Sequence, residues 1–492
     1  MSTAVDAVLS ERFGIGALYP VQRRVVDRVL SGGDALVVLP TGSGKSLCYQ
    51  LPAVLREGEM DDPGVCLVFS PLIALMEDQV ASLKARGIRA TYINSTLSKK
   101  ERERRQDAVR DGAFELVYAT PERMARPGFR DAIETVGVKL LAVDEAHCIT
   151  KWGHDLRPAY QEIGRFREEL GRPVTVALTA TATREVREDI LRVLGTDERE
   201  MPLFAEPIER PNLSLDAEQI WSDEDKVAAV RRVAAANAGT GIVYFSLIKE
   251  LERFVPLLSR ALPRGEAGGC EVGVYHGKLP PREKKRVYER FAAATPGDRL
   301  VLLATNAFGM GVDKPDIRFI VHAQMPGSVE AYFQEVGRAG RDGEPSSCLL
   351  LMSEDDLAVQ TEFTQWQNPG AELLLELGRV MAGSDHHDWD AEELRLKVFG
   401  KAGGHSKRAV IEYAMIDLEK RGVVERTGFS GEHEKVRGEV TRYRFVRPLD
   451  ESEVDRDEIE NKRKRDLTRL LRVLEMSRSG NVRGFVNDYF EV

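Results

Sequence analysis

Short apolar runs alternate with helix-length segments through the first 200 residues of the chain. The runs are rich in valine and leucine, and turn or charged residues bound each of them. Parallel strands that helices cover on both faces show this near-continuous hydrophobic pattern. It therefore predicts a parallel α/β sheet with strands at 34–39, 65–70, 115–119, 139–143 and 174–178.

A second series of the same kind follows residue 209. Its apolar runs, again separated by helical spacers, lie at 241–245, 271–276, 299–305 and 318–323. Pro211 and Asn212 interrupt the pattern between the two series, so the joint between two domains is expected there. The predicted α/β fold is two tandem parallel-sheet domains, at 1–208 and 209–352.

The pattern changes after the second series. A helical connector is expected over 353–388, and two helical patterns, at 390–403 and 406–428, precede a strand pattern at 440–448. Helix, turn, helix and hairpin is the order of a winged helix, which we predict over 389–449.

Ser406 is expected to cap the second of these helices, which would place Lys407 and Arg408 in its first turn. Both are candidate DNA contacts, although winged helices also mediate protein contacts. Residues 430–439 would form the wing. The segment 385–390 contains two adjacent histidines that point different ways, and it is predicted to be a polar loop rather than a metal site.

Composition is that of a soluble globular protein, with 42% hydrophobic and 30% charged residues. No run approaches the roughly 18 consecutive apolar residues of a membrane span. The first residues lack a basic leader followed by an apolar block, so a cytoplasmic protein with no membrane partner is expected. The five cysteines are scattered without a C-x-x-C pair, which argues against disulfides and against a zinc site.

The net charge of −9 argues against a protein that coats nucleic acid by charge alone. A local basic stretch does occur at 461–484, where lysine and arginine recur through a helical pattern. The stretch fits a DNA-binding face and a solvated helix face equally well.

Residues 40–46 read PTGSGKS and lie between a predicted strand and a predicted helix. A glycine-rich turn in this place lets backbone N–H groups face a phosphate. Lys45 would reach the β and γ phosphates of ATP, and Ser46 would ligate Mg²⁺. Leu39 departs from the glycine that begins the strict motif. The residues expected to bind ATP here are Thr41, Gly42, Ser43, Gly44, Lys45 and Ser46.

An acidic pair and two arginines complete the candidate catalytic set. At the end of a predicted strand, Asp144 would hold Mg²⁺ and Glu145 would polarise the attacking water. In the second domain Gln334, Arg338 and Arg341 recur at helical spacing, so both arginines could point toward a phosphate. Arginines that reach across a domain cleft stabilise the charge of a transferring phosphoryl group. Taken alone, these groups also fit solvent-facing acids and a surface ion-pair network. Beside a phosphate loop they indicate ATP hydrolysis.

The order of these motifs resembles that of the RecQ family of superfamily 2 helicases, from about Phe13 to Gly343. The resemblance implies two RecA-like domains and makes Gln22 the reader of the adenine base, although Tyr19 stands where the family usually has arginine. The segments that resemble the family's DNA-tracking and coupling motifs are 70–80, 119–124, 177–183 and 304–318.

The resemblance also implies roles for single residues in these segments. His147, Thr179 and Thr181 would couple the nucleotide state to domain closure. Contacts to the DNA backbone, which position a strand without reading its sequence, would come from Ser70, Thr120 and Thr305.

Residues 147–160 resemble the aromatic-rich loop that follows the acidic pair in RecQ proteins. Trp152 offers a stacking face to an unpaired base, an interaction worth about 1–3 kcal/mol. His154 and Arg157 are expected to contact phosphate or base. Leu156 replaces the usual phenylalanine. The alternative is that these aromatic side chains simply pack the domain.

The segment 450–492 resembles the helical hairpin that opens the zinc-binding subdomain of the family, but Asn481 occupies the likely first ligand position. The winged-helix pattern also precedes this hairpin, whereas the family normally places it after. We therefore predict a zinc-free hairpin with a basic face available to DNA. Its packing residues would be Leu467, Leu470, Leu471, Leu474, Phe485, Val486 and Phe490.

Together these features predict an ATP- and Mg²⁺-dependent DNA helicase, with 3′-to-5′ polarity implied by the family. Its partners would be single-stranded DNA, duplex junctions and single-strand-binding or repair proteins, and its pathway DNA repair or recombination. Two alternatives share the motor, an RNA helicase and a double-strand DNA translocase. An ATP-independent DNA-binding regulator would need inactivated ATPase motifs, which the sequence does not show.

Trp152→Ala is expected to weaken the stimulation of ATP hydrolysis by single-stranded DNA more than basal hydrolysis, because the loop lies a few residues from Glu145. Steady-state ATPase rates with and without DNA measure both quantities. Unchanged stimulation would support the packing alternative.

Purified protein is expected to contain no bound zinc, because a structural site needs four closed ligands and no cysteine follows Cys348. Elemental analysis after dialysis against a mild chelator measures the content. One retained zinc per chain would contradict this prediction.

Overall fold

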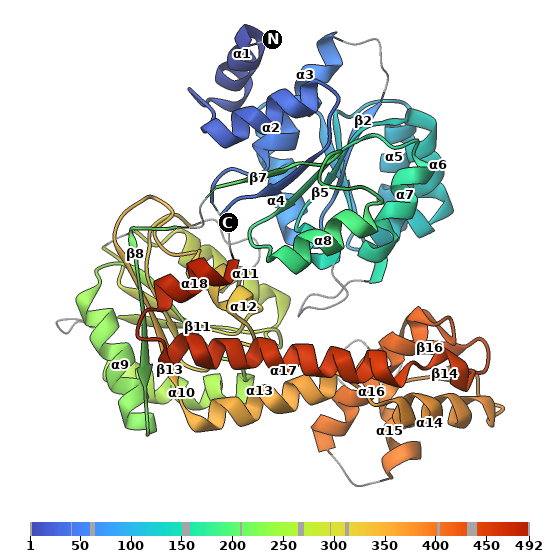
Figure 1. The fold of residues 1–492 in the computed structure, drawn as a ribbon. Helices are drawn as coiled ribbons and strands as arrows, with labels where there is room; N and C mark the ends of the chain where they lie inside the picture. Colours follow the sequence, from blue (N-terminus) through green and yellow to red (C-terminus); the bar gives the residue numbers. More distant parts are fainter. Residues whose placement is uncertain are drawn as a thin grey trace. The chain divides into compact units, whose positions relative to one another are not determined.

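The computed structural model describes residues 2–40, 42–59, 64–149, 158–206, 209–263, 270–295, 297–309, 314–400, 404–430 and 440–490. Residues 1–352 and 476–492 form one compact unit, and residues 353–475 form a second. The first unit contains two parallel sheets with covering helices (Figure 1).

The first sheet has the order β3-β4-β2-β5-β6-β1-β7, and every neighbouring pair is parallel. The five predicted strands are confirmed within it. Two short strands were not predicted, because β3 has a polar residue, Thr91, among its four and the three residues of β7 are not fully buried. The strands are β1 (Ala35–Val38), β2 (Val65–Phe69), β3 (Ala90–Ile93), β4 (Leu116–Ala119), β5 (Val138–Val143), β6 (Val174–Thr179) and β7 (Leu203–Ala205).

Alternate residues of strand β1 belong to two separate cores. Val37 packs with the helices on one face, and Leu36 and Val38 pack with those on the other. Both faces are buried, which explains the continuous apolar runs. The covering helices on the first face are α1 (Ser2–Phe13), α2 (Pro20–Leu30), α3 (Leu47–Glu59) and α4 (Ile73–Ala85); the others are α5 (Lys99–Arg110), α6 (Pro127–Val136), α7 (Ile163–Glu169) and α8 (Arg184–Val193) (Figure 1).

The second sheet has the order β10-β11-β9-β12-β13-β8 and is also parallel throughout. It confirms the second predicted α/β domain. Its strands are β8 (Leu213–Gln219), β9 (Thr240–Tyr244), β10 (Glu271–Tyr275), β11 (Leu300–Ala304), β12 (Ile317–His322) and β13 (Ser346–Met352). Its helices are α9 (Asp223–Ala236), α10 (Ile248–Ala261), α11 (Pro281–Ala292) and α12 (Val329–Val336).

The second unit contains helices and one antiparallel sheet of order β14-β16-β15. Its core includes Trp389, Leu394, Ile411, Leu418 and Tyr443. Its element order is the one predicted for a winged helix, and most of the predicted wing, 431–439, lies outside the described residues. Its elements are α13 (Glu354–Gln367), α14 (Ala371–Ala382), β14 (Asp388–Trp389), α15 (Ala391–Phe399), α16 (Gly404–Lys420), β15 (Val424–Ser430), β16 (Val440–Phe445) and most of α17 (Arg456–Arg478).

Two predictions for this unit are corrected by the structure. The segment 385–390 is not a loop throughout, because Asp388 and Trp389 form β14 and pair with β16. The buried Trp389 anchors that strand in the core. Helix α16 begins at Gly404, so Ser406 lies inside its first turn rather than before it.

Two helices, α17 and α18 (Val482–Phe490), occupy most of residues 456–490. Of the predicted packing residues, Leu470, Val486 and Phe490 are buried, but Leu471 is 50% exposed. The buried positions of α17 instead continue through Val473 and Met476, at helical spacing from Leu470. No described helix is both long enough and apolar enough to span a bilayer.

Candidate functional site

The glycine-rich loop follows β1 and leads into α3. Gly42 and Gly44 have positive φ angles of 82° and 70°, a conformation that favours glycine and lets the chain turn tightly. The ammonium of Lys45 donates to the carbonyls of Leu39, at 3.0 Å, and Pro40, at 3.2 Å. Burial lowers the pKa of Lys45, while Glu145 and Asp144 act to raise it. Thr41 lies outside the described residues.

Gln22 is buried behind this loop. Its side-chain N–H group donates to the carbonyl oxygens of Ser43, at 2.7 Å, and Gly44, at 3.3 Å, and its oxygen accepts from the Tyr19 backbone at 2.9 Å. The Gln22 amide therefore supports the loop in this structure, and its role as base reader stays a prediction. Tyr19, which is 63% exposed, presents its ring to the adjoining cavity.

The acidic pair lies at the end of β5, beside the loop. Burial and the neighbouring Glu145 raise the pKa of Asp144 to about 7. Burial also acts to raise the pKa of Glu145, but a hydrogen bond with His147 and the charges of His147, Lys45 and Arg338 outweigh it and lower that pKa. The pair thus separates into one carboxyl that holds its proton more readily and one that stays ionised.

Glu145 has a positive φ of 49°, a conformation that costs an ordinary residue on the order of 1 kcal/mol. Its backbone N–H donates to Oδ1 of Asp144 at 3.0 Å. Its Oε2 atom is buried and lies 3.3 Å from Nδ1 of His147. A buried carboxylate that stays ionised and is oriented by a neighbouring imidazole fits a water-activating base.

His147, Thr179 and Thr181 come together behind the acidic pair. His147 Nδ1 lies 3.3 Å from Glu145 Oε2 and 3.0 Å from Thr179 Oγ1. The Thr179 hydroxyl in turn donates to the carbonyl of Thr181 at 3.0 Å. Burial acts to lower the pKa of His147, but Cys148 and Glu145 outweigh it and raise that pKa well above its usual value. The structure therefore links the acidic pair to the end of β6.

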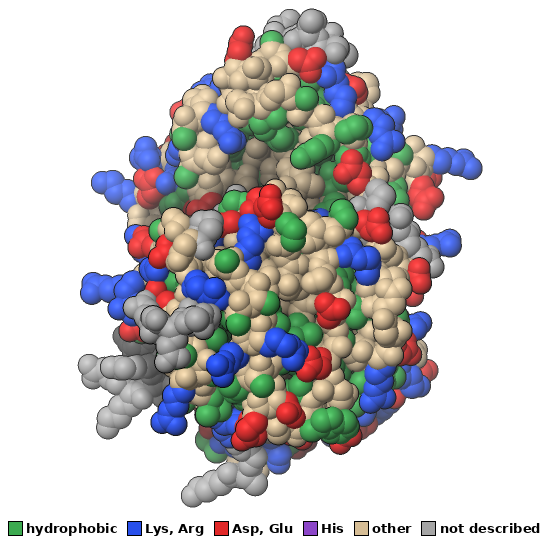
Figure 2. Space-filling view, turned by 90° about the vertical axis from the view of Figure 1, so that its left-hand side faces the viewer, with side chains coloured by type: hydrophobic (Ala, Val, Ile, Leu, Met, Phe, Trp, Pro, Cys, Tyr) green, Lys and Arg blue, Asp and Glu red, His purple; other side chains and the backbone are tan. Residues whose placement is uncertain are grey.

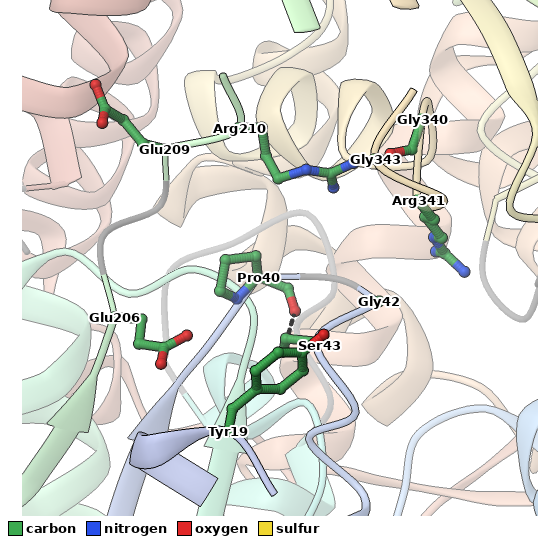
Figure 3. Close-up of a pocket in the computed structure, with 10 residues that line it drawn as sticks. All are labelled: Tyr19, Pro40, Gly42, Ser43, Glu206, Glu209, Arg210, Gly340, Arg341 and Gly343. Atoms are coloured by element: carbon green, nitrogen blue, oxygen red, sulfur yellow. Dashed lines mark hydrogen bonds between the residues drawn. The ribbon is translucent and has the colours of Figure 1, made fainter. Parts of the chain in front are cut away.

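A cavity of about 230 Å³ adjoins the loop (Figure 3). Residues of both sheet domains line it. In Figure 3 Arg210 and Arg341 extend from the second domain, opposite Pro40, Ser43 and Tyr19 of the first. The lining residues are Tyr19, Pro40, Gly42, Ser43, Glu206, Glu209, Arg210, Gly340, Arg341 and Gly343.

The two predicted arginines have different surroundings. Arg341 reaches the phosphate loop, because a methyl group added at Gly42 would lie 3.2 Å from its side-chain carbons. Arg338 is buried inside the second domain, where its guanidinium donates to the carbonyl of Gly309. Gln334 is half-buried on α12 and does not line the cavity. Arg341 is thus the predicted catalytic residue of this domain that lines the cavity.

Five lining residues outside the phosphate-loop region were not predicted from the sequence: Glu206, Glu209, Arg210, Gly340 and Gly343. For the first three the signal was present in part, because Pro211 and Asn212 marked the joint that brings them there. The two domains meet at this joint, so residues beside it can line a site between them.

The residues predicted to contact the DNA backbone lie at the carboxyl ends of β-strands, as the phosphate loop does. Ser70 follows β2, Thr120 follows β4 and Thr305 follows β11. Ser70 and Thr305 are buried in this structure. The aromatic loop residues Trp152, His154 and Arg157 lie outside the described residues.

Basic residues of the second unit are largely engaged with neighbours. Arg408 pairs with Glu412 at 2.9 Å, and the Lys407 ammonium lies 4.7 Å above the ring of Phe399. On α17, Arg472 pairs with Glu475 at 2.7 Å. Figure 2 shows acidic and basic side chains interspersed over one face of the molecule. The described pairs on α17 resemble a solvated helix face more than an unopposed basic track.

Residues 19–189 match the DEAD/DEAH box helicase family, and residues 225–343 match the helicase conserved C-terminal domain. A probable ATP-dependent DNA helicase of Bacillus subtilis (strain 168), RecS, is 36% identical over 78% of this chain and 74% of its own length. The chain belongs to the RecQ family of superfamily 2 helicases. The ATP-dependent DNA helicase RecQ of the same bacterium is 44% identical over 66% of this chain and 51% of its own length.

The fold of this RecQ-family chain resembles the helicase MrfA in a crystal structure with DNA. The TM-score is 0.60 at 20% identity, over 92% of this chain and 64% of MrfA. At that identity the likeness concerns the fold alone. The chain spans 51% of the length of the RecQ helicase of Bacillus subtilis and 60% of the length of the putative ATP-dependent DNA helicase Q1 of Caenorhabditis briggsae.

Thr179→Val removes the hydroxyl that holds His147 while keeping the shape of the side chain. We expect kcat for ATP hydrolysis to fall on the order of tenfold, because Glu145 loses its oriented neighbour, while KM for ATP stays within about twofold. Steady-state kinetics with single-stranded DNA measure both. Thr179→Ser keeps the hydroxyl and serves as the control. Equal kcat for the valine variant and the wild type would contradict a role for this contact.

Proposed function

We propose that this chain is an ATP- and Mg²⁺-dependent DNA helicase that moves along single-stranded DNA and unwinds duplexes. The observation that carries the proposal is the meeting of Lys45, the acidic pair and Arg341, which come from two sheet domains, at the phosphate loop. Glu145, Asp144 and Arg341 all lie close enough to Lys45 to shift its pKa.

The residues present fit a nucleoside triphosphate with its metal ion. The glycine φ angles turn the loop backbone, Lys45 supplies a cation, and Glu145 supplies a carboxylate that stays ionised. Ser46 and Asp144 would hold Mg²⁺, which neutralises charge on the phosphate oxygens when bound.

In the proposed reaction Glu145 accepts a proton from water while the water oxygen attacks the γ-phosphorus. The bond from that phosphorus to the bridging oxygen breaks, and ADP leaves with the electron pair. Lys45 and Arg341 stabilise the negative charge that spreads over the phosphoryl oxygens. The His147, Thr179 and Thr181 contacts would report this state to the end of β6.

The substrate assignment to DNA is supported by the names of the relatives, which are DNA helicases. The family implies 3′-to-5′ movement and a role in repair or recombination, with single-stranded DNA and duplex junctions as partners. An RNA helicase or a double-strand translocase remains the second candidate, because the motor itself is shared. We also propose that the C-terminal hairpin holds no zinc, in keeping with Asn481 at the first ligand position.

An unwinding assay compares 3′-tailed, 5′-tailed and forked DNA with an RNA duplex, in the presence of ATP and Mg²⁺. The proposal expects the 3′-tailed and forked DNA substrates to be separated and the RNA duplex to be left intact. Separation of RNA alone, or of 5′-tailed DNA alone, would contradict it.

Lys45→Ala is expected to reduce ATP hydrolysis on the order of a hundredfold or more, because the triphosphate loses its buried cation. Binding of single-stranded DNA should change little, since Lys45 lies in the phosphate loop and is not among the residues predicted to contact DNA. Phosphate release and fluorescence anisotropy measure the two activities. The exposed Lys84 on α4 provides a matched control as Lys84→Ala. Turnover within tenfold of wild type would refute the assignment of this loop.

A further inference from the structure

A tight turn joins the two sheet domains. Residues Arg210, Pro211, Asn212 and Leu213 form it, and the Leu213 N–H donates to the Arg210 carbonyl at 3.0 Å. Proline in the second position presets the backbone for such a turn. The turn leads directly into β8 and, through Arg210, lines the cavity.

One side of this turn holds the loop that carries Arg341. The Arg210 guanidinium donates to the carbonyls of Ala339, at 2.9 Å, and Gly340, at 2.6 Å. The Asn212 amide donates to Gly340 at 2.8 Å and to the carbonyl of Glu344 at 3.0 Å. With a longer bond from Arg210 to the carbonyl of Gly337, at 3.5 Å, five side-chain hydrogen bonds connect the turn to the backbone on both sides of Arg341.

The contact at Gly340 leaves no room for a side chain. Gly340 has a φ of +53°, and a methyl group added there would lie 2.5 Å from the Asn212 amide and 2.7 Å from the Glu344 carbonyl. Arg341 is the next residue, and its side chain lies against Gly42 of the phosphate loop. The position of the turn thus sets the position of Arg341.

The helix α18 holds the same turn from the other side. The Arg483 guanidinium donates to the carbonyl of Arg210 at 3.0 Å and also to the carbonyl of Leu213. These two carbonyls are the first and last of the turn, so one planar fork spans it. Next to it, Asn487 donates to Glu209, another lining residue of the cavity, at 3.3 Å.

The far end of α18 is anchored on the second domain. The Tyr489 hydroxyl donates to the Glu330 carboxylate at 2.9 Å, and Phe490 packs on Phe333 with ring centroids 5.4 Å apart. Phe490 and Val486 are buried. Both anchor residues, Glu330 and Phe333, belong to α12, which immediately precedes the loop with Arg341. The helix α18 therefore contacts the turn at 210–213 and also α12, the two elements that flank the loop with Arg341.

We propose that α18 is a brace for the catalytic arginine, and that Arg483 is a positioning residue that acts on Arg341 through the turn. The inference rests on the proposed function, because it assigns to a C-terminal helix control over the rate of ATP hydrolysis. Arg483 touches neither the loop around Lys45 nor the cavity. Its removal frees the turn, and a displacement of a catalytic group by about 1 Å costs up to about a hundredfold in rate.

The test uses the full chain with Arg483→Ala, Arg483→Lys and the control Arg478→Ala, which removes an exposed arginine from the end of α17. We expect Arg483→Ala to lower kcat of DNA-stimulated hydrolysis about tenfold, with KM for ATP within about twofold of wild type. Arg483→Lys should lie between, because one ammonium cannot replace a fork on both carbonyls. Arg478→Ala should match the wild type.

A temperature series separates positioning from loss of fold. The kcat defect should persist well below the thermal midpoint of each variant, where every molecule is folded. A defect that disappears there, or wild-type kcat in both Arg483 variants, would overturn the brace. If Arg483→Ala does not purify as folded protein, the comparison of Arg483→Lys with wild type decides. Absence of ATP hydrolysis by the wild type would instead refute the proposed function.

Discussion

The motor unit, residues 1–352 and 476–492, depends on a group of buried charges. These charges lie at the carboxyl ends of the strands of its two parallel sheets. Lys45, Asp144, Glu145 and His147 lie within one domain, and Arg341 arrives from the other. Burying charge is costly unless each charge is paired and hydrogen-bonded. Lys45 donates to two carbonyl oxygens of the loop, and His147 lies between Glu145 and the Thr179 hydroxyl, so these charges have polar partners.

Much of this arrangement follows from local sequence. A parallel strand buried on both faces needs a run of apolar residues. Such runs mark where the strands end, and the motif at 40–46 follows one of these ends. The phosphate loop and the acidic pair are each contiguous, so their chemistry is visible without knowledge of the fold. Residues whose role is set by a single neighbouring strand or turn could therefore be predicted.

Other features depend on contacts between distant parts of the chain. Arg338 and Arg341 have the same residue type and lie three positions apart, yet one binds the Gly309 carbonyl and the other reaches the phosphate loop. Arg483 and the carbonyl it binds are 273 positions apart, and no local pattern signals that bond. Leu471 satisfied a helical apolar pattern, but the buried face of α17 runs from Leu470 through Val473 and Met476 instead. Periodicity defines a stripe on a helix, and only its neighbours decide which edge of the stripe is covered.

The division of the chain into two units affects when α18 becomes available during protein synthesis. The motor unit is made of residues 1–352 and 476–492, so the second unit is inserted between them in sequence. Domains fold as they emerge during synthesis, N-terminal parts first. The two sheets can assemble before the second unit exists, but the turn that holds Arg341 receives Arg483 only after the inserted unit has been made. All the residues of the phosphate site are therefore synthesised before Arg483, which fixes the position of Arg341. Full motor activity is delayed until the inserted unit has been translated.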